Sequence, residues 1–214
     1  SFPRAAGLAA RGLRGQMNTT PEPFEAAIEH VCSTTIAETA AAVDRDGSFP
    51  LQSIQALQAA GLLGALSSLE SGGLGLGLAG AARVVRRVAE ECGSTAMVLT
   101  MHYCGAAVLE AHAPIEVRRE AASGRHFSTL AFSESGSRSH FWAPVSTAET
   151  HNGHIRLNAS KSWVTSASYA TAYVWSSKPV AADGVSTLWL VPASAPGIEV
   201  RGPLTQLGPQ EIAF

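Results

Sequence analysis

Apolar residues recur at helical intervals through the first 125 residues of the chain. The spacing of Phe24, Ile28 and Val31 predicts a helix that begins near Thr20, a candidate N-cap, and continues to about residue 47. Four more helices are expected, over residues 50–61, around 83–91, over 95–112 and over 114–124. The helix over 95–112 is apolar nearly all round, which is typical of a helix in the middle of a bundle.

From about residue 126, Gly and Pro separate short runs of β-branched and aromatic residues. Candidate strands cover 128–132, 143–149, 155–159, 161–165, 172–176, 185–191 and 198–201. Asn152-Gly153 lies between two of them and is the sequence signal for a two-residue hairpin turn. The pattern predicts an α+β fold in which an all-α helical bundle is followed by an antiparallel β-barrel domain; a sandwich is the alternative.

The expected domain limits are 18–125 for the helical domain and 126–214 for an incomplete β domain. Residues 1–17 form a leader that contains three arginines before Met17 and no acidic residue. We interpret it as an expression tag, a transit-peptide remnant or a disordered leader. The three cysteines form no CxxC pair and favour a reducing, cytoplasmic location.

Charged residues are scarce. Lys and Arg number 15 and Asp and Glu 17, together 15% of the chain, whereas 46% of residues are hydrophobic. A typical globular chain has about 25% charged residues, so apolar surface is expected to be covered in a homo-oligomer or by a further segment. The net charge of −2 argues against nucleic-acid binding. No apolar run is long enough for a membrane span, and the histidines and cysteines have no metal-site spacing.

Gly75, Gly77 and Gly80 match the GxGxxG pattern of dinucleotide-binding loops. That fingerprint requires a preceding strand and a βαβ unit, whereas these glycines lie between predicted helices. We therefore interpret the segment as a glycine-rich connection between helices.

Residues 130–141 and 161–167 are the segments that indicate chemistry. The first is an apolar strand followed by a loop with four serines, one glycine and one arginine, which offers many donors to an anion or a polar heterocycle. In the second, Trp163 and Thr165 alternate on a predicted strand, so both side chains should face one side and flank a planar cofactor. The alternative is a solvated serine-rich hairpin followed by a strand with a core tryptophan.

The same two segments resemble motifs of the acyl-CoA dehydrogenase family. Residues 133–140 (SESGSRSH) stand in place of the family's Thr-Glu-Pro-x-Ala-Gly-Ser-Asp, and 158–167 (NASKSWVTSA) fit Asn-Gly-x-Lys-x-Trp-Ile-Thr-Asn-(Ala/Gly). Weaker matches occur at 46–50, 61–62, 72–73 and 207–208. The similarity covers about residues 20–208.

The resemblance implies FAD as the cofactor. Ser133 stands where a threonine contacts the flavin pyrimidine edge, Trp163 where a tryptophan packs beside the flavin, and Thr165 where a threonine bonds the N5 region. Ser139 stands where a serine approaches the FAD phosphates and the acyl site. The remaining flavin-contact positions implied are Leu130, Phe132 and Ser166.

The resemblance also indicates a substrate site. Candidates to line it are Arg138, Ser139, Met97, Met101, His102 and Tyr103. Arg138 and His140 replace the family's Gly and Asp, and a surface arginine or bundle-core residues are the alternative interpretations.

The implied activity is α,β-dehydrogenation of an acyl-CoA or acyl-carrier thioester in fatty acid metabolism. The resemblance also implies an electron-transferring flavoprotein as the electron acceptor and a homodimer or homotetramer as the assembly. The family's catalytic carboxylate lies in a C-terminal helical domain that the sequence does not contain, so we name no base. A flavin-dependent monooxygenase or oxidase of the same fold, or a non-catalytic subunit completed by another chain, are the alternatives.

Overall fold

A computed structural model describes residues 23–134, 136–137, 143–180 and 183–201. The helical half begins with α1 (Pro23–Val31), which continues through a π-helical turn, η1 (Cys32–Ile36), into α2 (Ala37–Asp46). The remaining helices are α3 (Leu51–Ala59), the 3₁₀ turn η2 (Leu62–Gly64), α4 (Gly77–Glu91), α5 (Gly93–His112) and α6 (Ile115–Ala122). The helices expected from the pattern are thus confirmed, while the expected start at Thr20 lies outside the described residues.

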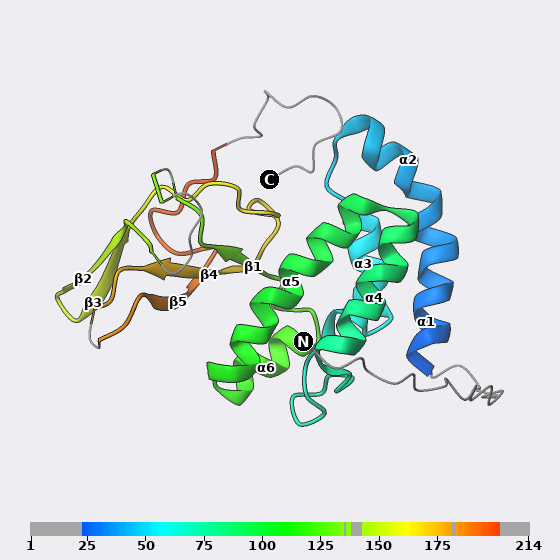
Figure 1. Ribbon diagram of the computed structural model, residues 1–214, viewed down its shortest axis with the longest axis horizontal. Helices are drawn as coiled ribbons and strands as arrows, with labels where there is room; N and C mark the ends of the chain where they lie inside the picture. Colours follow the sequence, from blue (N-terminus) through cyan, green and yellow to red (C-terminus); the bar gives the residue numbers. More distant parts are fainter. Residues whose placement is uncertain (1–22, 135, 138–142, 181–182, 202–214) are drawn as a thin grey trace, which may run out of the picture.

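The main helical core consists of apolar side chains from α1 to α5 and from the turns η1 and η2, and α6 adds the buried Ala121 and Ala122. The main core includes Leu57, Val84, Val88 and Leu99, all fully or almost fully buried. The longest helix, α5, lies between the other helices and strand β1 (Ser128–Ala131), as Figure 1 shows. The all-round apolar sequence of α5 is explained by this position, because the helix packs on helices on one side and on the sheet on the other.

The described strands of the β half form two sheets. β1, β4 (Ala172–Ser177) and β5 (Thr187–Pro192) form a three-stranded sheet in the order β1-β4-β5, and β2 (Thr147–His151) pairs with β3 (His154–Asn158). The order of a helical domain followed by a β domain is confirmed. One pair departs from the antiparallel expectation, because β1 and β4 run parallel. The long connection between them, which contains the β2–β3 hairpin, lets the chain return in the same direction.

The β2–β3 turn has the predicted geometry. Asn152 and Gly153 have φ of 50° and 76°, the positive values that a primed hairpin turn requires. Two strand predictions are wrong: residues 161–165 form turns with a single bridge at Lys161, and 198–201 form no strand. The glycine-rich segment follows a turn and leads directly into α4, with no strand before it in the described helical half, so the dinucleotide interpretation stays excluded.

His102 joins the two halves. Its Nδ1 accepts the backbone N–H of Ser128 at 3.2 Å, and its Nε2 lies 3.2 Å from the carbonyl oxygen of Leu63. The ring is fully buried and stacks on Phe127 with ring centroids 5.1 Å apart. These contacts fix the start of β1 against the helical domain, and β1 leads into the first of the two motif segments.

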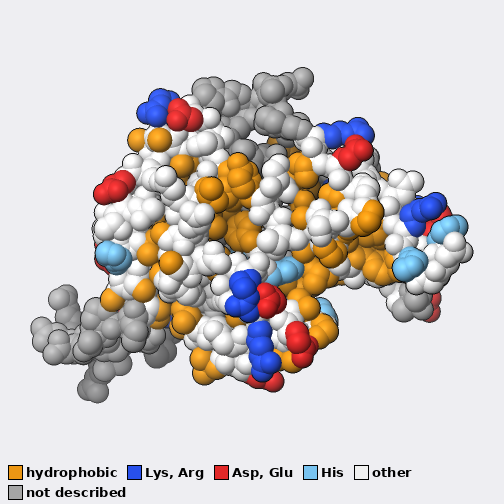
Figure 2. Space-filling model, turned by 180° about the vertical axis from the view of Figure 1, so that it is seen from behind, with side chains coloured by type: hydrophobic (Ala, Val, Ile, Leu, Met, Phe, Trp, Pro, Cys, Tyr) orange, Lys and Arg blue, Asp and Glu red, His pale blue; other side chains and the backbone are white. Residues whose placement is uncertain are grey.

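Hydrophobic side chains cover much of the molecular surface. In Figure 2 they form a broad patch across the middle of the face, with the charged side chains mainly toward its edges and its lower part. Exposed apolar residues include Leu69, Leu78, Val185 and Leu188. The expectation that a further segment or a second copy covers apolar surface stays a prediction.

Candidate functional site

The two motif segments meet in space. Glu134 and Lys161 form an antiparallel β-bridge, and the Ser162 N–H donates to the Ser133 carbonyl oxygen at 2.9 Å. On the first segment, Ser137 closes the turn, because its hydroxyl donates to the Glu134 carbonyl oxygen at 3.0 Å. The structure therefore places Ser133 beside the chain that leads into Trp163.

A buried ion pair reinforces this junction. Lys161 Nζ lies 2.5 Å from Glu134 Oε1, and the two side chains are only 3% and 2% exposed. The Glu134 carboxylate also accepts the N–H groups of Val145 (2.7 Å) and Ser146 (3.0 Å) and the Ser146 hydroxyl. Lys161 donates further to the Ser176 carbonyl oxygen (2.6 Å) and hydroxyl (3.1 Å). We call these four residues, Glu134, Ser146, Lys161 and Ser176, the ion-pair cluster.

The hydrogen bonds of the cluster determine the charge of Glu134. Burial alone acts to raise the pKa of this carboxyl group. The Lys161 ammonium, the Ser146 hydroxyl and the two backbone amides outweigh it and hold the pKa below the usual range of a glutamate. Glu134 is therefore ionised at neutral pH, and both lone-pair positions of each oxygen face donors.

The turn after Lys161 differs from the predicted strand. Trp163 and Ser166 have φ of 57° and 63°, in the left-handed backbone region that residues other than glycine rarely adopt. Trp163 is 51% exposed whereas Thr165 is buried, so the expectation that these two side chains share one face of a strand is wrong. A period-two pattern requires extended backbone at every residue, and the left-handed turn reverses it.

The far end of this turn is also held. The Thr129 hydroxyl on β1 donates to the Thr165 carbonyl oxygen at 2.7 Å, and the N–H of Ala170 donates to the Ser166 carbonyl oxygen at 2.8 Å. The Ser166 hydroxyl is buried and has no hydrogen-bond partner among the described residues. A buried hydroxyl of this kind is costly unless it bonds to water or to another polar group, and it is one of six such buried atoms among the described residues.

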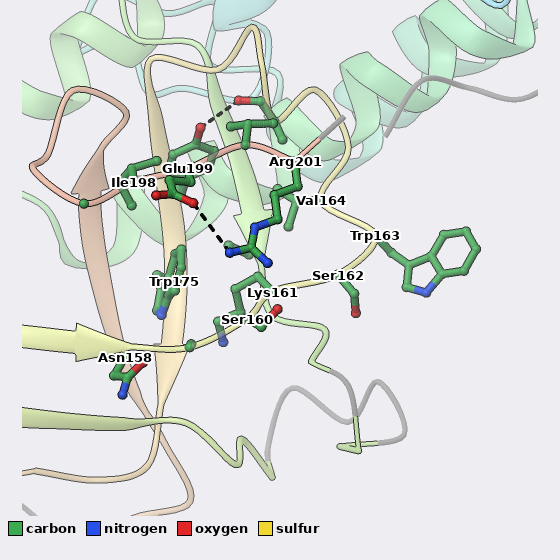
Figure 3. A pocket seen from close by; sticks show the side chains of 16 residues that line it. Asn158, Ser160, Lys161, Ser162, Trp163, Val164, Trp175, Ile198, Glu199 and Arg201 are labelled. Carbon is green, nitrogen blue, oxygen red and sulfur yellow. Dashed lines mark hydrogen bonds and ion pairs between the residues drawn. The ribbon is translucent and has the colours of Figure 1, made fainter. Parts of the chain in front are cut away.

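A pocket of about 670 Å³ opens beside the turn. It is lined by Ala131, Tyr173 and Trp175 of the sheet and by Lys161 and Trp163 of the turn segment. Lys161 Nζ lies 5.2 Å from the centroid of the Trp175 ring. In Figure 3 the Trp163 ring points away from the other labelled side chains, and the exposed Glu199–Arg201 ion pair (3.5 Å) crosses the pocket.

The other predicted site residues are distributed as follows. Leu130 and Phe132 are half-buried at and just after the end of β1, so the flavin-contact positions 130–133 are contiguous with the junction. Arg138 and Ser139, like His140, lie outside the described residues. The functional assignment of these residues stays a prediction.

The candidate acyl-pocket residues separate on α5. Met97 is 40% exposed and Met101, one turn later, is half-buried. Tyr103 is instead buried in the helical core, where its hydroxyl donates to the Leu62 carbonyl oxygen at 2.5 Å. His102 joins the two domains, as described above. The structure thus places Met97 and Met101 apart from Tyr103, and the acyl-pocket assignment stays a prediction.

Two family models match the chain. The model of the acyl-CoA dehydrogenase N-terminal domain matches residues 19–122, and that of the middle domain matches residues 129–214. This chain belongs to the acyl-CoA dehydrogenase family. The resemblance seen in the two motifs is thereby confirmed.

Curated relatives are distant. The chain is 28% identical over 186 residues to the probable acyl-CoA dehydrogenase YngJ of Bacillus subtilis, covering 81% of this chain and 48% of that protein. It is 27% identical over 178 residues to the human mitochondrial short-chain specific acyl-CoA dehydrogenase, covering 79% of this chain and 43% of that protein. The chain thus spans about half the length of these relatives.

Solved structures share the fold. FMN-bound TdsC from Paenibacillus sp. A11-2 matches with a TM-score of 0.73 and 23% identity, over 88% of this chain and 48% of that one. The methanesulfinate monooxygenase MsuC from Pseudomonas fluorescens matches with a TM-score of 0.73 and 20% identity, over 90% and 49%. At these identities the two likenesses establish the fold and nothing finer.

Two further observations concern the described residues. Within those ranges, no helix combines the length and the apolar character that crossing a bilayer requires. The same part of the chain brings no three His, Cys, Asp or Glu side chains together in a group that would hold a metal ion.

Proposed function

We propose that this chain forms the flavin-binding part of an FAD-dependent acyl-thioester dehydrogenase. The observation that carries the proposal is the junction of the two motif segments at Glu134 and Lys161, with Ser133 beside the Trp163 turn. The residues at this junction suit a flavin, because a half-exposed indole lies near several hydroxyl groups and the Ser166 hydroxyl is without a partner in the described chain. Family membership supports a flavin cofactor independently.

Each residue would contribute through its own chemistry. The hydroxyls of Ser133, Thr165 and Ser166 would donate to the polar edge of the ring system, where preorganised donors stabilise developing negative charge. The Trp163 indole would cover one side of the ring and exclude water from it. Leu130 and Phe132 would supply apolar contacts from the end of β1, and Ser139 would approach the phosphates.

When bound, FAD would supply the acceptor for the hydride that leaves the β-carbon of the thioester. The substrate proposed is an acyl-CoA or acyl-carrier thioester, with Met97 and Met101 toward the acyl chain and Arg138 toward the carrier. Because the chain spans about half the length of its relatives, we assign no proton-abstracting carboxylate to it. An electron-transferring flavoprotein as acceptor, a homo-oligomeric assembly and a cytoplasmic location belong to the same proposal.

The test is an anaerobic titration of the full-length native protein, loaded with FAD, with acyl-CoAs of increasing chain length. Loss of the oxidised-flavin absorbance with at least one acyl-CoA is expected, and Ser133→Ala should slow it. Ser123→Ala, which removes an exposed hydroxyl of the helical domain, is the matched control. If no acyl-CoA reduces the bound flavin, dehydrogenation is the wrong chemistry.

A flavin monooxygenase is the second candidate, because MsuC has the same fold and because residue 135 is a serine where the family motif has proline. Oxygen consumption after reduction of the flavin separates the two. Substrate-dependent, rapid oxygen uptake supports the monooxygenase, whereas slow uptake together with reduction by acyl-CoA supports the dehydrogenase.

A further inference from the structure

The buried ion pair has a more specific role than holding two segments together. We propose that Glu134 and Lys161 are a positioning pair that fixes the Trp163 ring at the edge of the pocket for stacking against a flat ligand. The identity of that ligand as a flavin rests on the proposed function, whereas the positioning of the ring does not.

The first step is the reach of the ion-pair cluster. It connects four separate parts of the chain: the loop after β1, the segment before β2, the segment after β3, and β4. Every donor of the Lys161 ammonium is used, by Glu134 and by the carbonyl oxygen and hydroxyl of Ser176. The backbone before Trp163 is therefore fixed by side-chain bonds and, through Ser162, by a bond to the Ser133 carbonyl oxygen.

The second step is the conformation that follows. Trp163, two residues after Lys161, has a left-handed φ of 57°, and Ser166 repeats this at 63°. Each such residue costs of the order of 1 kcal/mol or more and persists only where the surroundings hold it. The described contacts hold the turn at both ends, through Lys161 on one side and through the Thr129–Thr165 hydrogen bond on the other.

The third step is the energetic character of the pair. A buried ion pair gains little net stability over well-packed apolar side chains, because both charges lose their hydration. Its benefit is geometric, since an ammonium and a carboxylate with every hydrogen bond satisfied accept only one arrangement. For this chain we infer that the geometry so fixed is that of the Trp163 turn, which begins directly after Lys161.

The chain contains a matched control. Glu120 and Arg125 form an ion pair of similar length, 2.7 Å, at the connection between α6 and β1, but both side chains are largely exposed. Glu120→Gln therefore makes the same chemical change as Glu134→Gln without touching the turn. Glu134→Gln keeps an oxygen for the amides of Val145 and Ser146. It is therefore a milder change to the buried pair than Lys161→Met, which removes the cation.

The first measurement needs no ligand: fluorine NMR of the protein labelled with fluorotryptophan. The chain has four tryptophans, and the Trp163 resonance is identified by its absence from Trp163→Phe. We expect one narrow Trp163 line in the native protein and in Glu120→Gln, and a broadened or split line in Glu134→Gln and Lys161→Met. An unchanged Trp189 line shows that a variant is folded, and if Lys161→Met does not fold, Glu134→Gln decides. A single narrow Trp163 line in the folded variants overturns the proposal.

The second measurement is a double-mutant cycle on flavin affinity. Glu134→Gln should weaken flavin binding by about tenfold in the native background but by less than about twofold when Trp163 is already alanine, because the pair acts through that ring. Equal losses in both backgrounds, or no loss, contradict the positioning role. If the native protein binds no flavin, the proposed function fails, and the fluorine spectra still decide the positioning of the ring.

Discussion

His102 makes the stability of the fold depend on pH. Its ring is fully buried, accepts the Ser128 N–H on Nδ1 and donates from Nε2 to the Leu63 carbonyl oxygen, so only the neutral form fits. Burial lowers its pKa from 6.5 to about 4, and the positive charge of His126 acts in the same direction. The unfolded chain therefore takes up this proton at a higher pH than the folded chain does, and stability must fall as the pH drops from about 6.5 toward 4.

The magnitude follows from the two pKa values. Each factor of ten in proton affinity corresponds to about 1.4 kcal/mol, so the full difference is about 3 kcal/mol, most of it lost by about pH 4.5. The hydrogen bonds of Glu134 lower its pKa, so this carboxylate loses its charge at a lower pH than an ordinary glutamate does. The His126 pKa is also lowered by burial, so His126 adds to the loss in the same direction.

The assay is urea unfolding at about pH 7 and about pH 4.5. His102→Gln, whose amide can replace one donor and one acceptor, should remove about 2 to 3 kcal/mol of the pH-dependent loss while costing some stability at pH 7. His154→Gln, at an exposed position on β3, is the matched control. If His102→Gln loses as much stability between the two pH values as the native protein does, the assignment of this loss to His102 is refuted.

Three further changes test the packing. Gly105→Ala should cost about 1 to 3 kcal/mol in urea unfolding, because its methyl group would lie 2.5 Å from the Ser128 hydroxyl; a neutral result would mean that α5 and β1 are less closely packed. Lys161→Met leaves the Glu134 carboxylate buried without its cation and should cost about 3 to 5 kcal/mol, and adding Glu134→Gln should recover part of this; additive losses would argue against the ion pair. Gly153→Ala places a side chain at a φ of 76° and should lower the stability of the hairpin by about 1 kcal/mol. Faster amide hydrogen exchange in β2 and β3 would detect this loss, and unchanged exchange would contradict the turn geometry.

The sequence is informative where structure depends on neighbouring residues. Asn152-Gly153 determines its turn by local backbone preferences, and the helical spacing of apolar residues in α1 and α4 reports which face of each helix is buried. The parallel pairing of β1 with β4 is different, because it joins strands that are far apart in the chain and no local pattern encodes that alignment.

The candidate site was predictable in part. The two motif segments were identified, and the structure brings them together at Ser133 and Ser162. Their period-two pattern also suggested a strand through Trp163, which the left-handed turn contradicts. The pairing of Glu134 with Lys161 was not predicted, although one glutamate and one lysine in the two motif segments of a charge-poor chain are a usable signal for a buried pair. The role of His102 depends on Leu63 and Ser128, whose proximity only the fold reveals.

The central claim is that a flavin ring binds where the two motif segments meet. A crystal structure of the native protein with FAD tests this most directly. The account predicts the ring system against the Trp163 indole, with hydroxyl groups among Ser133, Thr165 and Ser166 within hydrogen-bonding distance of its polar edge. A flavin bound elsewhere on the chain, or a junction that stays free of flavin when FAD is present in excess, would contradict it.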